Sequence, residues 1–230
     1  ALREAGYVTT VEEIHARIPV LSDEENAATL YREGFALFTD VEDRNTSLVP
    51  LFGDVEVSEP YTEETLRIVH KFLLLNRESL KKYHAAAELK DAVFIEEYST
   101  GFELEISHLY DLRKATLLLC LEAEYALYTG DAEGSDRALL AAFSSSRALN
   151  NEYDVNSLMV RIGFEEIVLR AFERMLNNGE LSREVIEALY RRSLERDPIG
   201  CFKKGIQGHI VMGNIPYNEF LEYYKNTTIP

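Results

Sequence analysis

Two Glu-x-x-His spacings are the first feature of this sequence that could do chemistry. Glu12 lies three residues before His15, and Glu105 lies three residues before His108. On a helix this spacing places a carboxylate and an imidazole on one face, as in di-iron carboxylate bundles. Such a bundle also needs Glu ligands on two further helices, and the sequence singles none out. Glu is so abundant in this sequence that a Glu three residues before a His is expected by chance. We therefore expect no metal site and no cofactor.

Asn76 and His84 form a second pair of polar residues with helical spacing. They lie eight residues apart, on the same stripe as Leu73, Leu80 and Ala87, so both are expected to face inward. Inward polar groups need partners. One interpretation is that they bond backbone carbonyls or a buried water and fix the helix register. The other is that they line a ligand pocket between helices.

Arg113 and Arg161 lie beside the apolar stripes of two long helical segments. Glu122, Glu165 and Glu166 are near in sequence and could pair with them. A partly buried ion-pair network is one interpretation. If the carboxylates instead lie elsewhere, a buried guanidinium could bind an anionic ligand, because its fork matches a carboxylate or a phosphate.

The only Gly-rich, basic stretch lies near the C-terminus and superficially resembles a phosphate loop. Its glycines and lysines are Gly200, Lys203, Lys204, Gly205, Gly208 and Gly213. The Gly-x4-Gly-Lys-Ser/Thr spacing is absent, and the apolar residues between the glycines keep helix period. Close packing of a helix explains these glycines better. No Ser or Cys lies in a Gly-flanked turn with the partners of a nucleophile.

Helix signals dominate the elements that must position these residues. Capping boxes predict helix starts at Thr10, Ser22 and Thr100, and Asp197-Pro198 predicts a fourth start. Between these signals the apolar residues recur at three and four positions, which is helix period. The predicted helices lie near residues 10–17, 23–40, 62–88, 101–129, 132–150, 154–177, 182–196, 198–212 and 217–225.

The connections indicate how these helices are arranged. Short turns at 128–131 and 177–179 predict antiparallel hairpins. The stretch 41–61, with Pro50, Gly53 and Pro60, is expected to be an irregular arm, extended or with a short strand at 54–57. We predict one all-α domain over 1–230, an irregular stack of antiparallel helical hairpins forming an α-α superhelix.

One hairpin resembles a tetratricopeptide repeat. It runs from Ala126 through the turn Gly130-Asp131 to small and aromatic packing positions at Ser135, Ala142 and Phe143. No 34-residue period recurs. The stack is therefore TPR-like rather than a true repeat array.

A second resemblance covers roughly residues 6–165 and rests on loose patterns of packing residues. They are Gly6-Tyr7, Val11-Glu12-Glu13-Ile14, Glu25-Asn26-Ala27-Ala28, Leu30-Tyr31, Asn76, Leu80, His84, Ala86-Ala87, His108-Leu109, Leu112-Arg113, Leu121-Glu122-Ala123, Gly130-Asp131, Leu158 and Val160-Arg161-Ile162. This set resembles a family of uncharacterised bacterial all-helical proteins, whose members often carry one N-terminal transmembrane helix just upstream. The resemblance implies an extramembrane domain at the cell envelope. It implies no activity, cofactor or catalytic residue. At Gly205-Ile206-Gln207-Gly208-His209 the sequence departs from the Gly-Glu-Arg-Ala-like run of that family.

Charge and composition narrow the partners. A formal net charge of −16 disfavours nucleic acid and anionic lipid over most of the surface. The longest apolar runs are a few residues long, whereas a membrane span needs about twenty. Two cysteines, Cys120 and Cys201, provide no disulfide framework. The aromatic cluster at the C-terminus could dock the last helix or present a partner surface; it comprises Tyr217, Phe220, Tyr223 and Tyr224.

Three functional hypotheses follow. The leading one is a non-enzymatic helical scaffold that binds a protein or peptide in a groove between hairpins. The alternative is a small-ligand binder or enzyme with a pocket around Asn76, His84 and Arg113. The third is a structural module that holds the other parts of an anchored protein apart.

Overall fold

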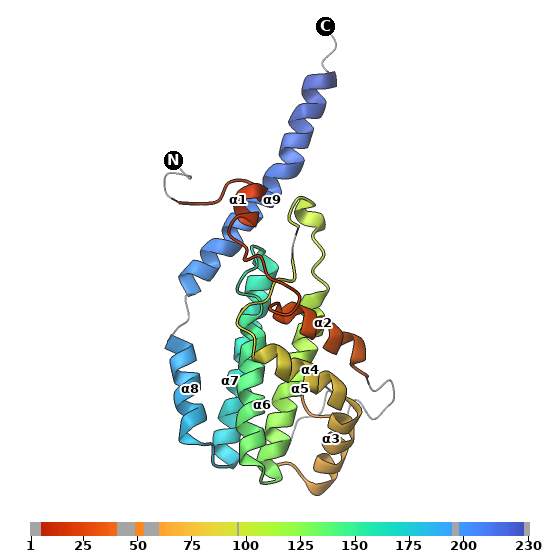
Figure 1. Ribbon diagram of the computed structural model, residues 1–230, viewed down its shortest axis with the longest axis vertical. Helices are drawn as coiled ribbons and strands as arrows, with labels where there is room; N and C mark the ends of the chain where they lie inside the picture. Colours follow the sequence, from red (N-terminus) through yellow and green to blue (C-terminus); the bar gives the residue numbers. More distant parts are fainter. Residues whose placement is uncertain (1–5, 41–48, 53–59, 96, 195–197, 228–230) are drawn as a thin grey trace.

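The computed structural model describes residues 6–40, 49–52, 60–95, 97–194 and 198–227 (Figure 1). Over these residues the fold is all-α, as predicted, with no strand beyond an isolated bridge between Asn26 and Asp91. The elements are α1 (Val11–His15), α2 (Ala27–Leu37), α3 (Glu63–Leu75), α4 (Arg77–Ala87), the short 3-10 helix η2 (Gly101–Glu103), α5 (His108–Tyr128), α6 (Ala132–Arg147), α7 (Val155–Asn178), α8 (Arg183–Leu194) and α9 (Pro198–Thr227).

Helices α5, α6 and α7 form the centre of the body and pack against one another. The predicted hairpin between α5 and α6 is present. Gly130 adopts a positive φ of 83° in its turn, and the Asp131 carboxylate caps α6 by accepting from the Gly134 N–H at 2.9 Å. Burial of apolar side chains from all three helices makes the main core; the fully buried ones include Leu112, Leu118, Leu119, Leu121, Leu139, Phe164 and Met175.

The predicted helix over 62–88 is wrong, because it is two helices that meet at Asn76. Asn76 is fully buried and has φ −100° and ψ 14°, outside the helical region. Its carboxamide donates to the Thr39 C=O at 3.1 Å and the Phe72 C=O at 3.2 Å, and accepts from the Thr39 N–H at 2.8 Å. The two bonds to Thr39, just after the end of α2, and the bond to Phe72 in α3 compete with a continuous α3–α4 helix.

The helix starts agree only in part with the capping boxes. Thr10 caps α1 as predicted, through the Glu13 N–H at 3.3 Å. Ser22 bonds Glu25, but α2 begins only after Asn26, whose side chain accepts from the Ala28 N–H. Thr100 makes no side-chain cap; the 3-10 helix η2 follows it, and α5 begins at His108.

Helix α9 begins at Pro198 as predicted, but it is one helix and not two. Two of its glycines, Gly205 and Gly208, confirm the close packing. A Cβ on Gly208 would lie 1.5 Å from the Tyr153 carbonyl oxygen, and one on Gly205 would lie 3.1 Å from Leu158 Cδ2. The helix therefore crosses the start of α7 in near contact, and its C-terminal half projects beyond the body (Figure 1).

A smaller core joins α1 and α9 to the rest of the chain. Its buried members are Val8, Ile14, Ile95, Tyr98, Tyr153, Val211 and Met212. Of the predicted arm, residues 41–48 and 53–59, with the possible strand 54–57, lie outside the described residues. The piece 49–52 packs on the main core, where the Phe52 ring meets Phe72 edge-on at 5.0 Å. Among the described helices, none is long and apolar enough to cross a membrane.

Candidate functional site: the His84 groove

A hollow of ≈ 560 Å³ lies between the α3–α4 pair and the end of the α5–α6 hairpin. We call it the His84 groove. The residues that matter most below are Leu74, Arg77, Lys81, His84, Glu122 and Arg137. It forms because α3 and α4 bend apart at Asn76, so that side chains of both helices face the hairpin.

The floor of the groove is apolar. Leu73 and Leu80 are buried and close it from below, beside Ala126 of α5. Leu74 lines the groove with 56% of its surface exposed, which is high for a leucine beside a core. Exposed apolar surface that lies in a concave, polar-rimmed site is typical of a binding surface.

Two polar contacts join the walls. The His84 Nε2 lies 2.7 Å from the Glu122 Oε2, which links α4 to α5. The Tyr125 hydroxyl lies 2.9 Å from the His70 Nδ1, which links α5 to α3. The His84 and Glu122 side chains are only 21% and 25% exposed. A hydrogen-bonded pair at this burial holds its two helices at a fixed spacing.

The rim carries more cations than carboxylates. Arg77, Lys81 and Arg137 line the groove, against the carboxylates of Glu122 and Asp131. Both of these carboxylates already have partners, since Glu122 bonds His84 and Asp131 caps α6. Counted over the lining residues, three cations against two carboxylates leave the rim one positive charge in excess, on a chain whose formal net charge is −16.

The cations of the rim differ in how they are engaged. Arg77 and Lys81 share one carboxylate oxygen of Glu78, at 3.2 and 2.9 Å. Arg137 is exposed and makes no ion pair with any described residue. Surface pairs of this kind are weak, so a ligand can compete for these side chains.

The groove continues into a second hollow of ≈ 520 Å³ along α4 and α6. The two hollows share His84 and Arg137, so both side chains lie at the midpoint of one elongated surface. The second hollow is more acidic, with Glu88, Glu133 and Asp136 in its lining. An elongated surface of this kind suits an extended or helical chain better than a compact molecule.

Of the four residues singled out in the sequence, the structure brings only His84 to this groove. Asn76 faces inward as expected, but its hydrogen bonds are those of a helix junction, and it does not line the groove. Arg113 is exposed on α5 and does not line it either. The expected cluster of Asn76, His84 and Arg113 is therefore not formed.

Arg161 lies apart from the groove, where α7 meets α9. Its Nη1 donates to the Cys201 Sγ at 2.6 Å, and its Nε lies 3.5 Å from the Glu165 Oε1. The Arg161 and Glu165 side chains are 12% and 7% exposed. The structure therefore contains the partly buried ion pair that was one of the two interpretations of this arginine.

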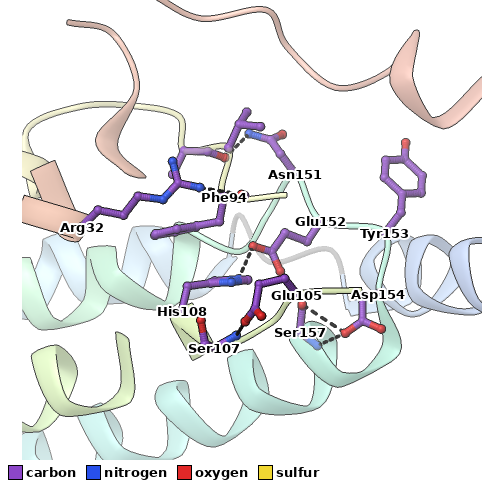
Figure 2. Close-up of polar contacts among 12 residues, drawn as sticks. Arg32, Phe94, Glu105, Ser107, His108, Asn151, Glu152, Tyr153, Asp154 and Ser157 are labelled. Atoms are coloured by element: carbon purple, nitrogen blue, oxygen red, sulfur yellow. Dashed lines mark hydrogen bonds and ion pairs between the residues drawn. The ribbon is translucent and has the colours of Figure 1, made fainter. Parts of the chain in front are cut away.

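The second Glu-x-x-His pair belongs to a polar junction at the start of α5 (Figure 2). His108 Nε2 contacts Glu152 Oε1 at 2.8 Å, and its ring stacks on Phe94 at 4.7 Å between centroids. The Arg32 guanidinium donates to the Phe94 carbonyl at 2.7 Å. Glu105 instead accepts from the Ser107 N–H. Within the described residues no group of three or more His, Cys, Asp or Glu side chains could hold a metal ion.

Glu152 is the least satisfied group of this junction. It is buried, and its Oε2 has no hydrogen-bond partner among the described residues. Glu152 also lines a cavity of ≈ 10 Å³ together with Asn150, Arg161, Cys201 and Lys204. A cavity of that size has room for about one water molecule. It has no room for an organic substrate, so the junction fixes the α6–α7 connection on α5 rather than forming an active site.

Sequence reasoning missed most of the groove. His70, Arg77, Lys81 and Arg137 were not singled out, because each is an ordinary polar residue on the outer face of a helix. For His70, Arg77 and Lys81 the only available signal was their spacing relative to Leu73 and Leu80, which places them beside an apolar stripe; for Arg137 on α6 there was none.

Comparisons with protein families, curated proteins and solved structures find no match to this chain. The fold and site define an all-helical protein with an interhelical groove.

Proposed function

We propose that this protein is a non-enzymatic helical scaffold that binds an acidic peptide segment with apolar anchor residues in the His84 groove. The observation that carries the proposal is Leu74, which is 56% exposed on the floor of a concave surface rimmed by Arg77, Lys81 and Arg137. Apolar side chains of the peptide would cover this floor. Its carboxylates would bind the rim.

The dimensions favour a chain over a compact ligand. The two hollows of ≈ 560 and ≈ 520 Å³ meet at His84 and Arg137 and run along α4 and α6. Single ligand pockets usually hold about 300–1,000 Å³ and enclose most of the ligand. Two connected hollows on the surface instead match the helix-in-groove mode, in which apolar anchors occupy successive positions.

The charges of the rim favour carboxylates on the part of the peptide that occupies the His84 groove, whereas the part over Glu88, Glu133 and Asp136 in the second hollow is expected to carry few carboxylates. Arg137 has no ion-pair partner among the described residues, and Glu122 is already bonded to His84. A carboxylate on the peptide would give Arg137 a bidentate partner. A basic peptide would instead meet three cations at the rim and lose affinity.

The second candidate is a small-ligand binder or enzyme, and the His84–Glu122 pair at 2.7 Å favours it. A carboxylate that orients an imidazole is the arrangement of a general base. Among the described residues, however, no Ser or Cys lines the His84 groove itself, and Ser144 lines only the second hollow. The one hydroxyl of that type in the His84 groove, on Thr129, donates to the Tyr125 carbonyl at 2.9 Å.

A location at the cell envelope, through an anchor upstream, remains part of the proposal. It is supported by the resemblance to anchored bacterial proteins and by no feature of the groove.

The test is selection of binders from a display library of random 16-residue peptides, with affinities then measured by fluorescence anisotropy. Leu74→Glu and Leu75→Glu form a matched pair, since the two leucines are adjacent and 56% and 53% exposed, and only Leu74 lines the groove. We expect selected peptides to be rich in Asp, Glu and large apolar residues. Leu74→Glu should weaken them at least 10-fold, and Leu75→Glu less than 2-fold.

Other outcomes decide against the proposal. Failure to select any binder, basic consensus sequences, or equal affinity for both leucine variants would each refute it. A small molecule that raises the melting temperature, with a shift that His84→Ala abolishes, would favour the second candidate. If neither the peptide selection nor the small-molecule screen identifies a binder, the purely structural module is the remaining hypothesis.

A further inference from the structure

The outer face of α7 carries an apolar stripe that nothing in the described chain covers. Met159, Ile162, Leu169 and Leu176 are 63%, 52%, 46% and 46% exposed. With Glu166 and Glu173 between them, they follow a 3-4-3-4-3 spacing along the helix. This is the spacing of the a and d positions of a coiled coil, with glutamates at two of the six positions. The opposite side of α7 is the one that faces the core, through Phe164, Val168, Ala171 and Met175.

The outer face of α7 also contains a glycine, Gly163, which is independent evidence for a contact there. It lies inside α7, next to Ile162, and a Cβ built on it would meet no atom within 4 Å. Glycine in a helix interior costs about 1 kcal/mol relative to alanine. No contact with a described residue offsets that cost, whereas the close approach of a helix from another molecule would offset it.

Glu166 and Arg170 are self-complementary across a two-fold axis, whereas Glu173 would lie opposite Ile162 of the second copy. Arg170 pairs with Glu166 on its own helix at 2.6 Å, and both side chains are largely exposed, at 69% and 60%. In an antiparallel pair of α7 helices, the register that sets Met159 opposite Leu176 of the second copy sets Glu166 opposite Leu169. Arg170 of the second copy then lies beside Gly163 and within one turn of Glu166. The arrangement repeats by two-fold symmetry.

The amount of exposed apolar surface agrees with an interface. Half-exposed side chains of this size leave roughly 80–100 Å² each in water, so the four of α7 together expose roughly 320–400 Å². A patch of that size is often functional, and an interface built from it belongs to the weak, reversible class.

We propose that α7 is the interface between two copies of this chain, paired antiparallel about a two-fold axis near residue 168. The apolar seam supplies the association. The two Arg170–Glu166 contacts between copies set its register. This surface is separate from the His84 groove, to which α7 contributes no lining residue.

A charge-swap experiment tests the pairing and its register by sedimentation velocity and equilibrium on the full chain. Glu166→Arg places two cations, and Arg170→Glu places two carboxylates, at each intercopy contact, so each variant alone should dimerise at least 10-fold more weakly than the original chain. An equimolar mixture of the two restores both intercopy contacts while the pair within each copy stays broken. We expect the mixture to recover to within about 3-fold of the original dissociation constant.

Matched controls separate the interface from general effects of charge. Glu187→Arg on α8 breaks a similar exposed pair, Arg183–Glu187 at 2.7 Å, and should not change association. Leu169→Arg should make the chain monomeric, and Leu37→Arg, at the same 46% exposure but on α2, should not. A monomeric original chain at 50 μM, or a mixture no more associated than its components, would overturn the proposal.

Discussion

The contact between Gly208 and the Tyr153 carbonyl is the tightest packing constraint that the structure identifies. A Cβ on Gly208 would lie 1.5 Å from that oxygen, whereas ordinary contact begins at 3.4 Å. Gly208→Ala therefore requires a relative movement of almost 2 Å. The Tyr153 backbone resists it, because its N–H donates to the buried Tyr98 hydroxyl at 2.9 Å and Asp154 next to it caps α7.

The size of the effect follows from two opposing contributions. Overpacking costs typically 1–3 kcal/mol and occasionally more, and a backbone oxygen cannot move aside as a side chain can. Replacing glycine by alanine inside a helix returns up to about 1 kcal/mol. A net loss of about 2 kcal/mol is expected, which for a chain of this length lowers the melting temperature by roughly 4–8 °C.

Gly213→Ala is the matched control on the same helix. The new Cβ there would meet Phe102 Cζ at 3.5 Å, an ordinary contact, so only the gain in helix propensity remains. Melting followed by circular dichroism should show Gly208→Ala below and Gly213→Ala at or above the original chain. Hydrogen exchange should show faster exchange in α9 for Gly208→Ala alone. An unchanged melting temperature with unchanged α9 protection in Gly208→Ala would refute the docking described above.

Three further outcomes are expected. Asn76→Ala removes three hydrogen bonds that join α2, α3 and α4. The free energy of unfolding, measured with urea, should fall by about 2–3 kcal/mol. A loss below about 1 kcal/mol would contradict the junction. Cys120 is fully buried, which raises the pKa of its thiol, so a thiol reagent should titrate only Cys201 until the chain unfolds. Burial raises the pKa of several tyrosines far above the usual 10, so the unfolded state releases their protons first, and stability should fall as pH rises above about 10. Absorbance at 295 nm should show these tyrosines titrating only with unfolding: Tyr31, Tyr61, Tyr83 and Tyr98.

Helix periodicity predicted the elements well where local signals decide them. The predicted helix 154–177 corresponds to α7 over Val155–Asn178, with Asp154 as its cap, and 182–196 corresponds to α8. The errors at Ser22 and within 62–88 have one cause. Asn76 ends α3 through bonds to Thr39, 37 residues distant, and Asn26, which caps α2 through the Ala28 N–H, is held in place by the Val93 N–H, 67 residues distant. No local pattern contains those partners.

The same difference between local signals and long-range packing explains which residues of the site were predicted correctly. His84 was placed correctly beside an apolar stripe, because α4 has one narrow buried face. The expected position of Arg113 beside His84 was wrong. Helix α5 is buried on almost every side between Leu112 and Ala123, so its apolar pattern does not show which way the Arg113 side chain points. The exposed sector of such a helix depends on how α3, α6 and α7 surround it. That information lies in the packing and not in the spacing.

The two proposed surfaces together have a consequence that neither has alone. Helix α7 packs on α5 and α6 through its inner face, and the His84 groove lies where the α5–α6 hairpin meets α3 and α4. Pairing through the outer face of α7 therefore leaves a groove on each copy, away from the interface. Such a dimer would bind a single peptide no more tightly than a monomer. It would bind two linked peptides with up to 10²–10⁴-fold greater avidity, provided the linker spans the grooves. Leu169→Arg should abolish that gain and leave the affinity for one peptide unchanged, whereas Leu74→Glu should reduce both.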